Sequence, residues 1–198
     1  RVTPQGIQPM PERVESIVSF PVPKDKAALQ RFLGMINYYH RFMPNIAEKL
    51  APLHTASAGR GTSINWSTEC QAAFDIAKAA LASVTLLHHP QIGDATRITV
   101  DASDTAIGAQ LEQRQQGTKV PIAFYSRKLS AAEKKYSAFD RELLAAYNAI
   151  KHFNHFVEGR KFTLFTDHKP LTFAFKKACD PLSARQQRHL AFVSEFTT

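Results

Sequence analysis

The sequence contains only two cysteines, Cys70 and Cys179, among its 198 residues. They are too few and too far apart in sequence for a disulfide framework or a cysteine-based zinc site. There is also no apolar run long enough to span a bilayer, no secretory leader, no internal repeat and no low-complexity tract. These absences favour a globular protein of a reducing compartment without a membrane partner. Because the chain begins with Arg1 rather than Met, we expect it to be a piece of a longer protein.

Acidic residues are fewer than basic ones, with 17 Asp and Glu against 25 Lys and Arg, and the net charge is +8. The excess occurs in both parts of the chain, nine basic against six acidic residues in 1–90 and sixteen against eleven in 91–198. Lys and Arg neutralise phosphates and release counterions, so a polyanion such as nucleic acid would suit this charge. Many soluble proteins are basic for no specific reason, and charge alone therefore indicates little.

The spacing of apolar residues changes near residue 90. The first ninety residues have helical periodicity interrupted by prolines, which predicts helices at about 11–20, 25–42, 45–57 and 67–83. Alternation with a period of two then predicts strands in TRITVD, GAQLEQR and KVPIAFYSR. A long helix at about 131–158, a strand in RKFTLFTD and a helix from about 184 follow. The pattern predicts two domains, a helical one at 1–90 and an α/β one at 91–198.

Three acidic residues occupy comparable positions in the α/β part. Asp101 and Asp167 each end a predicted strand, and Glu142 lies beside the apolar stripe of the long helix, which consists of Phe139, Leu143, Ala146, Ile150, Phe153 and Val157. Ligands of open α/β sheets bind at strand ends, and converging carboxylates need a cation, for which oxygen ligands favour Mg²⁺ or Mn²⁺. The residues alone leave a shared metal site and three independent surface acids equally open.

The helix predicted at 25–42 has an apolar and a polar side. The apolar side consists of Leu29, Phe32, Leu33, Ile36 and Tyr39, and the polar side of Lys26, Gln30, Gly34, Asn37 and Arg41. Gly34 costs helix stability unless something must approach the backbone closely. Two interpretations stay open: a second helix packs at Gly34, or a ligand does.

Long segments of the sequence resemble one family. VDASDTAIGAQL, YSAFDRELLAAYNAIKHFNHFVEGRKFTLFTDHKPL and PLSARQQRHLAFVSEF resemble the ribonuclease H (RNase H) domain of gypsy-type, Metaviridae-like LTR retrotransposon Pol polyproteins. GIQPMPERVESIVSFPVPKDKAALQRFLGMINYYHRFMPNIAEKLAPL is similar to the reverse transcriptase thumb or connection segment of the same polyproteins. The resemblance covers essentially the whole chain. It implies an α/β protein overall, with a helical thumb-like domain at 1–90 followed by an RNase H-like mixed-sheet domain at 91–198.

The resemblance implies a role for the three acids. Asp101, Glu142 and Asp167 match the family's first three metal-binding acids. Two Mg²⁺ or Mn²⁺ ions in the complete enzyme would activate a water for attack on an RNA phosphodiester and stabilise the leaving 3′ oxygen. Asp101 would bridge the ions, and Glu142 and Asp167 would hold one each or position water. The implied substrate is the RNA strand of an RNA/DNA hybrid, distinguished by its 2′ hydroxyls.

The resemblance also implies contacts with nucleic acid elsewhere. The spacing of Gln30, Gly34 and Tyr38, with Arg41 on the same side, resembles the thumb helix that reverse transcriptases place in the minor groove of the template–primer duplex. Candidates for phosphate contacts near the RNase H part are Arg127, Lys128, Lys134 and Lys135. A solvated charged face explains these four nearly as well.

Two elements of the family are absent from the sequence. Nothing resembles the polymerase palm, so we expect no polymerisation by this chain. The last strand and the last helix, which carries a fourth acid, are also missing, and we expect residues 91–198 to be a C-terminally truncated domain. The expected partners are the palm and integrase of the polyprotein, and the expected location is the cytoplasm, in virus-like particles, with access to the nucleus. The alternatives are an inactive connection module and a host-adopted derivative that binds nucleic acid or protein, although the three acids favour the enzyme.

Overall fold

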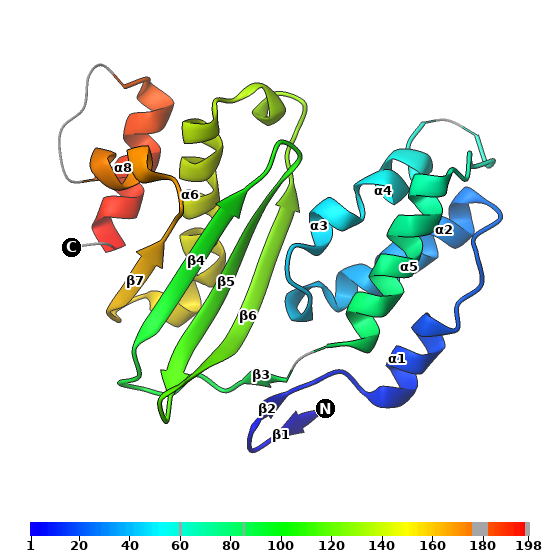
Figure 1. Cartoon of the computed structure of the whole chain (residues 1–198), viewed down its shortest axis with the longest axis horizontal. Helices are drawn as coiled ribbons and strands as arrows, with labels where there is room; N and C mark the ends of the chain where they lie inside the picture. Colours follow the sequence, from blue (N-terminus) through cyan, green and yellow to red (C-terminus); the bar gives the residue numbers. More distant parts are fainter. Residues whose placement is uncertain (60, 85, 176–181, 197–198) are drawn as a thin grey trace.

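A computed structural model describes residues 1–59, 61–84, 86–175 and 182–196, and Cys179 lies outside them. Figure 1 shows a group of helices beside a twisted sheet, whose other face is covered by further helices. The first group comprises α1 (Pro11–Val18), α2 (Lys26–Tyr38), α3 (Ile46–Lys49), α4 (Ala51–Ser57) and α5 (Thr68–Ala82). The second comprises α6 (Ala138–Val157), α7 (Lys169–Ala174) and α8 (Ala184–Phe196). Within the described residues, no helix is both long and apolar enough to cross a membrane.

The helix α2 is shorter than the sequence predicts. It begins after Asp25, whose carboxylate accepts a hydrogen bond from the Ala28 N–H at 2.8 Å, and it ends at Tyr38. A 3₁₀ turn over His40–Phe42 follows, so the single helix predicted at 25–42 is wrong at its end. The helix predicted at 45–57 is divided in two at Leu50, because Pro52 lies in the first turn of α4 and cannot continue α3.

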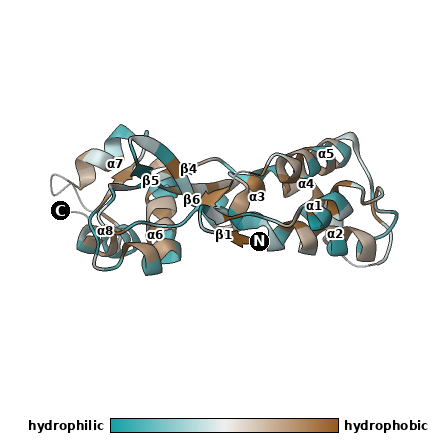
Figure 2. Cartoon of the chain, turned by 90° about the horizontal axis from the view of Figure 1, so that it is seen from below, coloured by the Kyte–Doolittle hydropathy of each residue, from teal (hydrophilic) through white to brown (hydrophobic). Residues whose placement is uncertain are grey.

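The predicted apolar side of α2 lies in the core of the helical part. Leu29, Phe32 and Ile36 are fully buried, and they pack with α1, α4 and α5 in one hydrophobic cluster. Phe124, from the sheet, belongs to the same cluster. Figure 2 shows the two parts next to each other along the length of the molecule, with apolar residues at their junction.

A small antiparallel sheet was not predicted from the sequence. Its strands β1 (Val2–Thr3), β2 (Gly6–Ile7) and β3 (Leu87–His88) are two residues long each. Segments this short have no detectable alternation, and β3 is far from the other two strands in sequence. The sheet joins the beginning of the chain to the segment that connects the two parts.

The main sheet has the strand order β6–β5–β4–β7. Its members are β4 (Thr96–Ala102), β5 (Ala106–Gln115), β6 (Thr118–Lys128) and β7 (Phe162–Phe165). The first three pair antiparallel, and β7 pairs parallel with β4, with Thr99 opposite Phe165. Because β4 and β7 run in the same direction, the residues that follow both strands emerge at one end of the sheet.

The long helix crosses the sheet but begins later than predicted. Its first turn is capped by Ser137, whose hydroxyl oxygen accepts a hydrogen bond from the Asp140 N–H at 3.1 Å, while residues 133–135 form a separate 3₁₀ turn. The predicted stripe is divided between two clusters. From Ala146 onward its members pack against the sheet, whereas Leu143 packs with Leu171 of α7 and Leu190 of α8.

Candidate metal site and nucleic-acid face

The three predicted acids converge at one end of the main sheet. Asp101 lies near the end of β4, Asp167 follows β7, and Glu142 lies near the start of α6. One carboxylate oxygen from each residue lies within 4.8 Å of the others. Asp101 and Asp167 are exposed, whereas Glu142 is only 5% exposed. The parallel pairing of β4 with β7 therefore produces the cluster that the sequence pattern left open.

Glu142 is fixed between the other two acids by their neighbours in sequence. One of its carboxylate oxygens accepts a hydrogen bond from the Ala102 N–H at 3.1 Å, and the other accepts one from the Thr166 hydroxyl at 3.3 Å. Burial, together with the charges of Asp167 and Asp101, raises the pKa of Glu142 to about 7, and the two hydrogen bonds partly oppose this rise. A bound cation would relieve the burial and repulsion that disfavour the charged carboxylate.

The chemistry of this donor set fits a hard divalent cation. Carboxylate oxygens are the ligands preferred by Mg²⁺ and Mn²⁺, and each of the three side chains offers one within 4.8 Å of the others. Among the described residues, these three acids form the group with metal-binding geometry. Asp140 does not join them, because its carboxylate is engaged by Ser137, Arg185 and Gln186.

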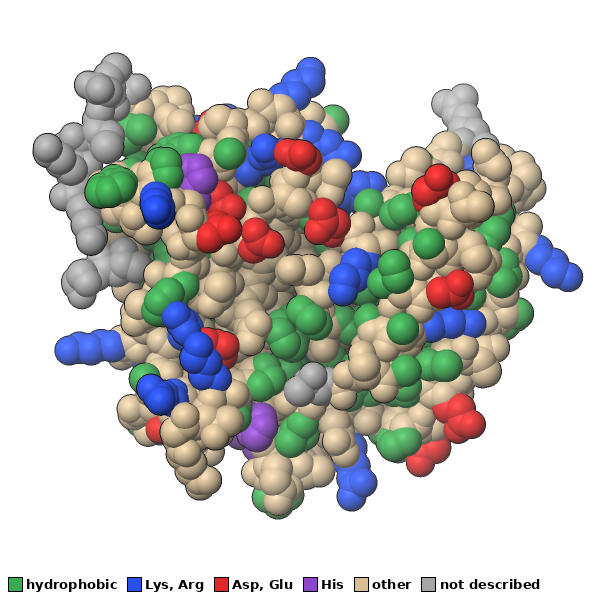
Figure 3. Space-filling model, in the orientation of Figure 1, with side chains coloured by type: hydrophobic (Ala, Val, Ile, Leu, Met, Phe, Trp, Pro, Cys, Tyr) green, Lys and Arg blue, Asp and Glu red, His purple; other side chains and the backbone are tan. Residues whose placement is uncertain are grey.

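The helical part reaches the metal site through α3, which the sequence did not indicate. The Thr105 hydroxyl, in the turn between β4 and β5, donates a hydrogen bond to Glu48 of α3 at 3.4 Å. Glu48 and Asn45 also line a small cavity together with Asp101. In Figure 3, Asp and Glu side chains gather over this area, with Lys and Arg side chains nearby. Contacts between two predicted domains leave no periodic signal in the sequence, and no pattern could have identified Glu48.

The polar side of α2 is open, and Arg41, predicted on this helix, lies in the 3₁₀ turn that follows it. Gln30, Gly34, Tyr38 and Arg41 are all exposed, and Tyr38 retains 77% of its accessible surface. A Cβ atom placed on Gly34 would meet no atom of the described residues within 4 Å. Packing among the described residues therefore does not explain Gly34.

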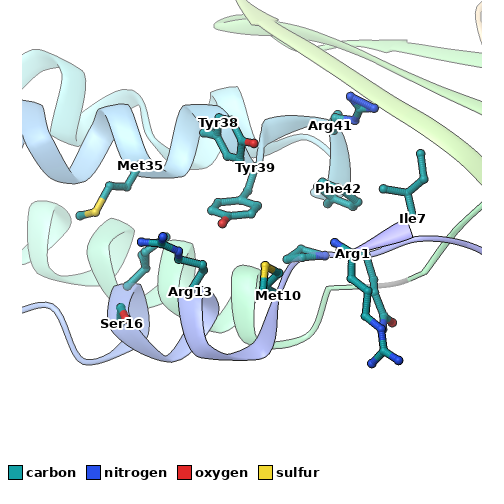
Figure 4. Close-up of a pocket in the computed structure, with 13 residues that line it drawn as sticks. Arg1, Ile7, Met10, Arg13, Ser16, Met35, Tyr38, Tyr39, Arg41 and Phe42 are labelled. Carbon is teal, nitrogen blue, oxygen red and sulfur yellow. The ribbon is translucent and has the colours of Figure 1, made fainter. Parts of the chain in front are cut away.

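Tyr38 and Arg41 lie at a groove of about 630 Å³ between α1 and the end of α2. Figure 4 shows Met10 and Arg13 across this groove from Tyr38 and Tyr39. Its charged lining side chains are arginines, whereas most of the remaining lining is apolar: Ile7, Pro9, Met10, Ile17, Met35, Tyr38, Tyr39 and Phe42. The groove extends the cationic and aromatic character of the exposed side of α2.

The predicted basic residues near the sheet differ in their surroundings. The Arg127 guanidinium makes two hydrogen bonds to the Glu133 carboxylate, at 2.9 and 3.0 Å, and this pairing lowers the pKa of Glu133 to about 2. Lys134 and Lys135 are exposed on the turn after β6, and Lys128 is half-buried. Arg127 is therefore held in a structural ion pair, whereas Lys134 and Lys135 face the solvent.

The fold occurs in solved structures of a viral enzyme. The foamy viral protease-reverse transcriptase in complex with RNA/DNA hybrid matches 98% of this chain and 27% of its own, with a TM-score of 0.79 and 21% identity. The same protease-reverse transcriptase in complex with dsDNA matches 96% of this chain and 40% of its own, with a TM-score of 0.77 and 20% identity. These matches include both the helical part and the sheet, so the fold is that of a reverse transcriptase segment.

Curated relatives and a family profile agree with this fold. The Retrovirus-related Pol polyprotein from transposon 412 of Drosophila melanogaster is 37% identical over 88% of this chain, and the Transposon Tf2-3 polyprotein of Schizosaccharomyces pombe is 29% identical over 98%. The chain spans only 14% and 15% of their respective lengths. The profile of the RNase H-like domain found in reverse transcriptase matches residues 66–164. The chain therefore belongs to the family of RNase H-like domains found in reverse transcriptase, and it corresponds to part of the Pol polyprotein of gypsy-type LTR retrotransposons.

Proposed function

We propose that residues 91–198 take part in hydrolysis of the RNA strand of an RNA/DNA hybrid and that residues 1–90 form a thumb that holds the duplex. The observation that carries the proposal is the convergence of three carboxylates, from β4, α6 and the end of β7, within 4.8 Å. Such a cluster is costly without a cation, and a phosphodiester supplies further anionic oxygens to the same cation.

Asp101, Glu142 and Asp167 would hold Mg²⁺ or Mn²⁺, two ions in the complete enzyme. When bound, these ions supply an activated water and stabilise the leaving 3′ oxygen. Asp101 would hold the ions together with Glu142 and Asp167, which would serve as ligands or position water. Glu142 would be the most rigidly held of the three ligands, because the Ala102 N–H and the Thr166 hydroxyl orient its buried carboxylate. Asp101 and Asp167 are exposed, and a phosphate would approach from their side.

The duplex partner is supported by the open side of α2. Gln30, Gly34 and Tyr38 would face the minor groove, where the missing side chain of Gly34 allows close approach. Arg41, Lys128, Lys134 and Lys135 would contact phosphates, whereas the pairing of Arg127 with Glu133 makes its role in binding indirect. The foamy viral enzyme with the same fold is described in complexes with RNA/DNA hybrid and with dsDNA, which supports duplex binding by this chain.

The other partners would be the palm and integrase segments of the same polyprotein. The share of the transposon polyproteins that this chain covers, 14% for the 412 protein, supports a larger assembly. Its place of action would be a virus-like particle in the cytoplasm, with access to the nucleus.

The test is cleavage of an RNA/DNA hybrid with a labelled RNA strand by this chain and by a longer piece of its polyprotein. The longer piece is expected to cleave in Mg²⁺ and to stop in EDTA, and Asp101→Asn is expected to slow it by about 100-fold or more at unchanged hybrid affinity. Asp94→Asn, which changes an acid outside the cluster, is the control and should cleave normally. Equal cleavage by Asp101→Asn would refute the assignment, and hybrid binding without cleavage in every version would indicate a non-catalytic binding module.

A further inference from the structure

Arg141 is the residue before Glu142 on α6, and its side chain is only 16% exposed. Its guanidinium donates hydrogen bonds to the Asp104 carboxylate and to the Ser103 carbonyl oxygen, the latter at 3.5 Å. Both acceptors belong to the turn between β4 and β5. A largely covered arginine thus joins the helix that carries Glu142 to the turn that follows Asp101.

Hydrogen bonds within this turn join its residues, so a contact that fixes one of them restrains the whole turn. The Ser103 hydroxyl oxygen accepts hydrogen bonds from the Thr105 N–H at 3.3 Å and from the Ala106 N–H at 3.1 Å. The Ser103 N–H donates to the Ala106 carbonyl at 2.9 Å. The turn begins directly after Ala102, whose N–H binds Glu142. The end of β4 is therefore tied to α6 at two successive places.

We propose that Arg141 is a positioning residue for the metal site, because it holds the turn after Asp101 against α6 and keeps the Asp101 carboxylate close to those of Glu142 and Asp167. The three carboxylates repel one another, so a stable cluster needs contacts from other residues that keep α6 and the turn after Asp101 together. The effect of Arg141 on cation binding rests on the proposed function. The link that Arg141 makes between α6 and the turn rests on its hydrogen bonds alone.

The two acceptors of Arg141 do not contribute equally. Asp104 is 87% exposed, so its ion pair with Arg141 is screened by water and adds little by itself. The Ser103 carbonyl lies in a part-buried contact and belongs to the backbone of the turn. Loss of the Arg141 donors should therefore weaken the link between α6 and the turn more than loss of the Asp104 charge does. The effects of the two changes should not add, because both remove the ion pair between Arg141 and Asp104.

The test uses four variants of the full chain. Arg141→Met keeps most of the apolar length but removes the donors, Arg141→Lys keeps a cationic donor, and Asp104→Asn removes only the charge of the acceptor. Arg185→Met is the matched control, because Arg185 pairs with Asp140 on the same helix at 3.0 Å and makes none of the contacts to the turn described above. Hydrogen exchange of the amides of residues 102–106 is measured without metal, and Mn²⁺ affinity is measured by titration.

Arg141→Met is expected to speed exchange at residues 102–106 and to weaken Mn²⁺ binding by about tenfold. Arg141→Lys should restore most of the slow exchange and most of the Mn²⁺ affinity. Asp104→Asn should change the affinity by less than about threefold, and Arg185→Met should leave exchange and affinity as in the parent. If the parent fails to bind Mn²⁺, the proposed function fails, but the exchange data still show whether Arg141 restrains the turn. The inference is overturned if Arg141→Met exchanges and binds like the parent, or if Arg185→Met reproduces its effects.

Discussion

Glu142 combines burial with a position between two other carboxylates. Its pKa of about 7 lies above the ordinary value of 4.5, so the folded state holds the proton more tightly than the unfolded state does. The resulting contribution to stability is fully present below about pH 4.5 and is lost as the pH rises through 7. At neutral pH, folding therefore works against the charge that metal binding requires.

The first prediction concerns this pH dependence. In EDTA, we expect the free energy of unfolding of the parent to fall relative to that of Glu142→Gln by roughly 2–3 kcal/mol between pH 5 and pH 8. The comparison with the variant is needed because burial lowers the pKa of His40 and His152, which has the opposite effect on the pH dependence. Denaturant unfolding at the two pH values measures the difference. A pH-independent difference would show that Glu142 is not the titrating group.

At the residue scale, the place of each acid on its strand or helix could be predicted, whereas their convergence stayed open and the environment of Glu142 was not predicted. Strand ends and a helix face follow from local periodicity, which places Asp101 and Asp167 each at a strand end and Glu142 beside an apolar stripe. The parallel pairing of β4 with β7, which brings the two strand ends together, is not visible in that periodicity. Periodicity does not reveal what covers a face. The sequence therefore predicts Glu142 at a rim, whereas α6 packs its first turns against both the strand ends and α7, and Glu142 is buried.

At the scale of elements, α2 resembles Glu142 in keeping a residue that lowers stability where a ligand is expected to bind. Its apolar side forms the core of the helical part, as predicted, and its other side keeps a glycine that no packing contact within 4 Å requires. Glycine in a helix interior is less favourable than alanine by about 1 kcal/mol. The helix would thus be more stable with alanine at position 34, and close approach of a ligand would account for the glycine.

Gly34→Ala is therefore expected to raise the free energy of unfolding by about 0.5–1 kcal/mol while weakening duplex binding by about tenfold. Fluorescence anisotropy with a labelled RNA/DNA hybrid measures the affinity, and thermal unfolding measures the stability. Ser194→Ala, an exposed change in α8, is the control for stabilisation without an effect on binding. Unchanged affinity in Gly34→Ala would exclude close approach of the duplex at this position.

Element boundaries were predictable only where a local signal marks them. Asp25 caps α2, and the predicted start at residue 25 agrees with it. Ser137 caps α6 and Pro52 separates α3 from α4, but the prediction followed the apolar pattern and extended both helices across these residues. The helix α7 was missed because it has only six residues and a single buried side chain, Leu171.

At the scale of the whole molecule, the two parts share a core and a polar contact. Phe124 of β6 is buried among the side chains of the helical part. The Ser126 hydroxyl oxygen accepts a hydrogen bond from the Ala47 N–H at 3.1 Å and lies 3.0 Å from His40 Nε2. Asn45, in the left-handed conformation with φ of 50°, packs against Gly108. Because Gly108 pairs with Asp101 across β4 and β5, the helical part contacts the sheet beside the metal site.

A Cβ atom at Gly108 would lie 2.2 Å from the Asn45 side-chain oxygen, so Gly108→Ala should displace Asn45. We expect a loss of about 1–3 kcal/mol in the free energy of unfolding, as for other overpacked sites. Asn45→Gly should restore most of it in the double variant, since glycine removes the side chain and accepts a positive φ. Thermal unfolding of the two single variants and the double variant measures this. A double variant as unstable as Gly108→Ala would place the strain elsewhere.

Asp101, Glu142 and Asp167 are expected to bind divalent cations together. The most direct measurement is the anomalous scattering of Mn²⁺ in crystals of this chain and of its Asp101→Asn variant, grown at pH 8, where Glu142 is mostly charged. We expect a peak among the three carboxylates in the parent and a much weaker peak in the variant. A parent crystal with no peak at these residues, or a peak that Asp101→Asn leaves unchanged, would contradict it.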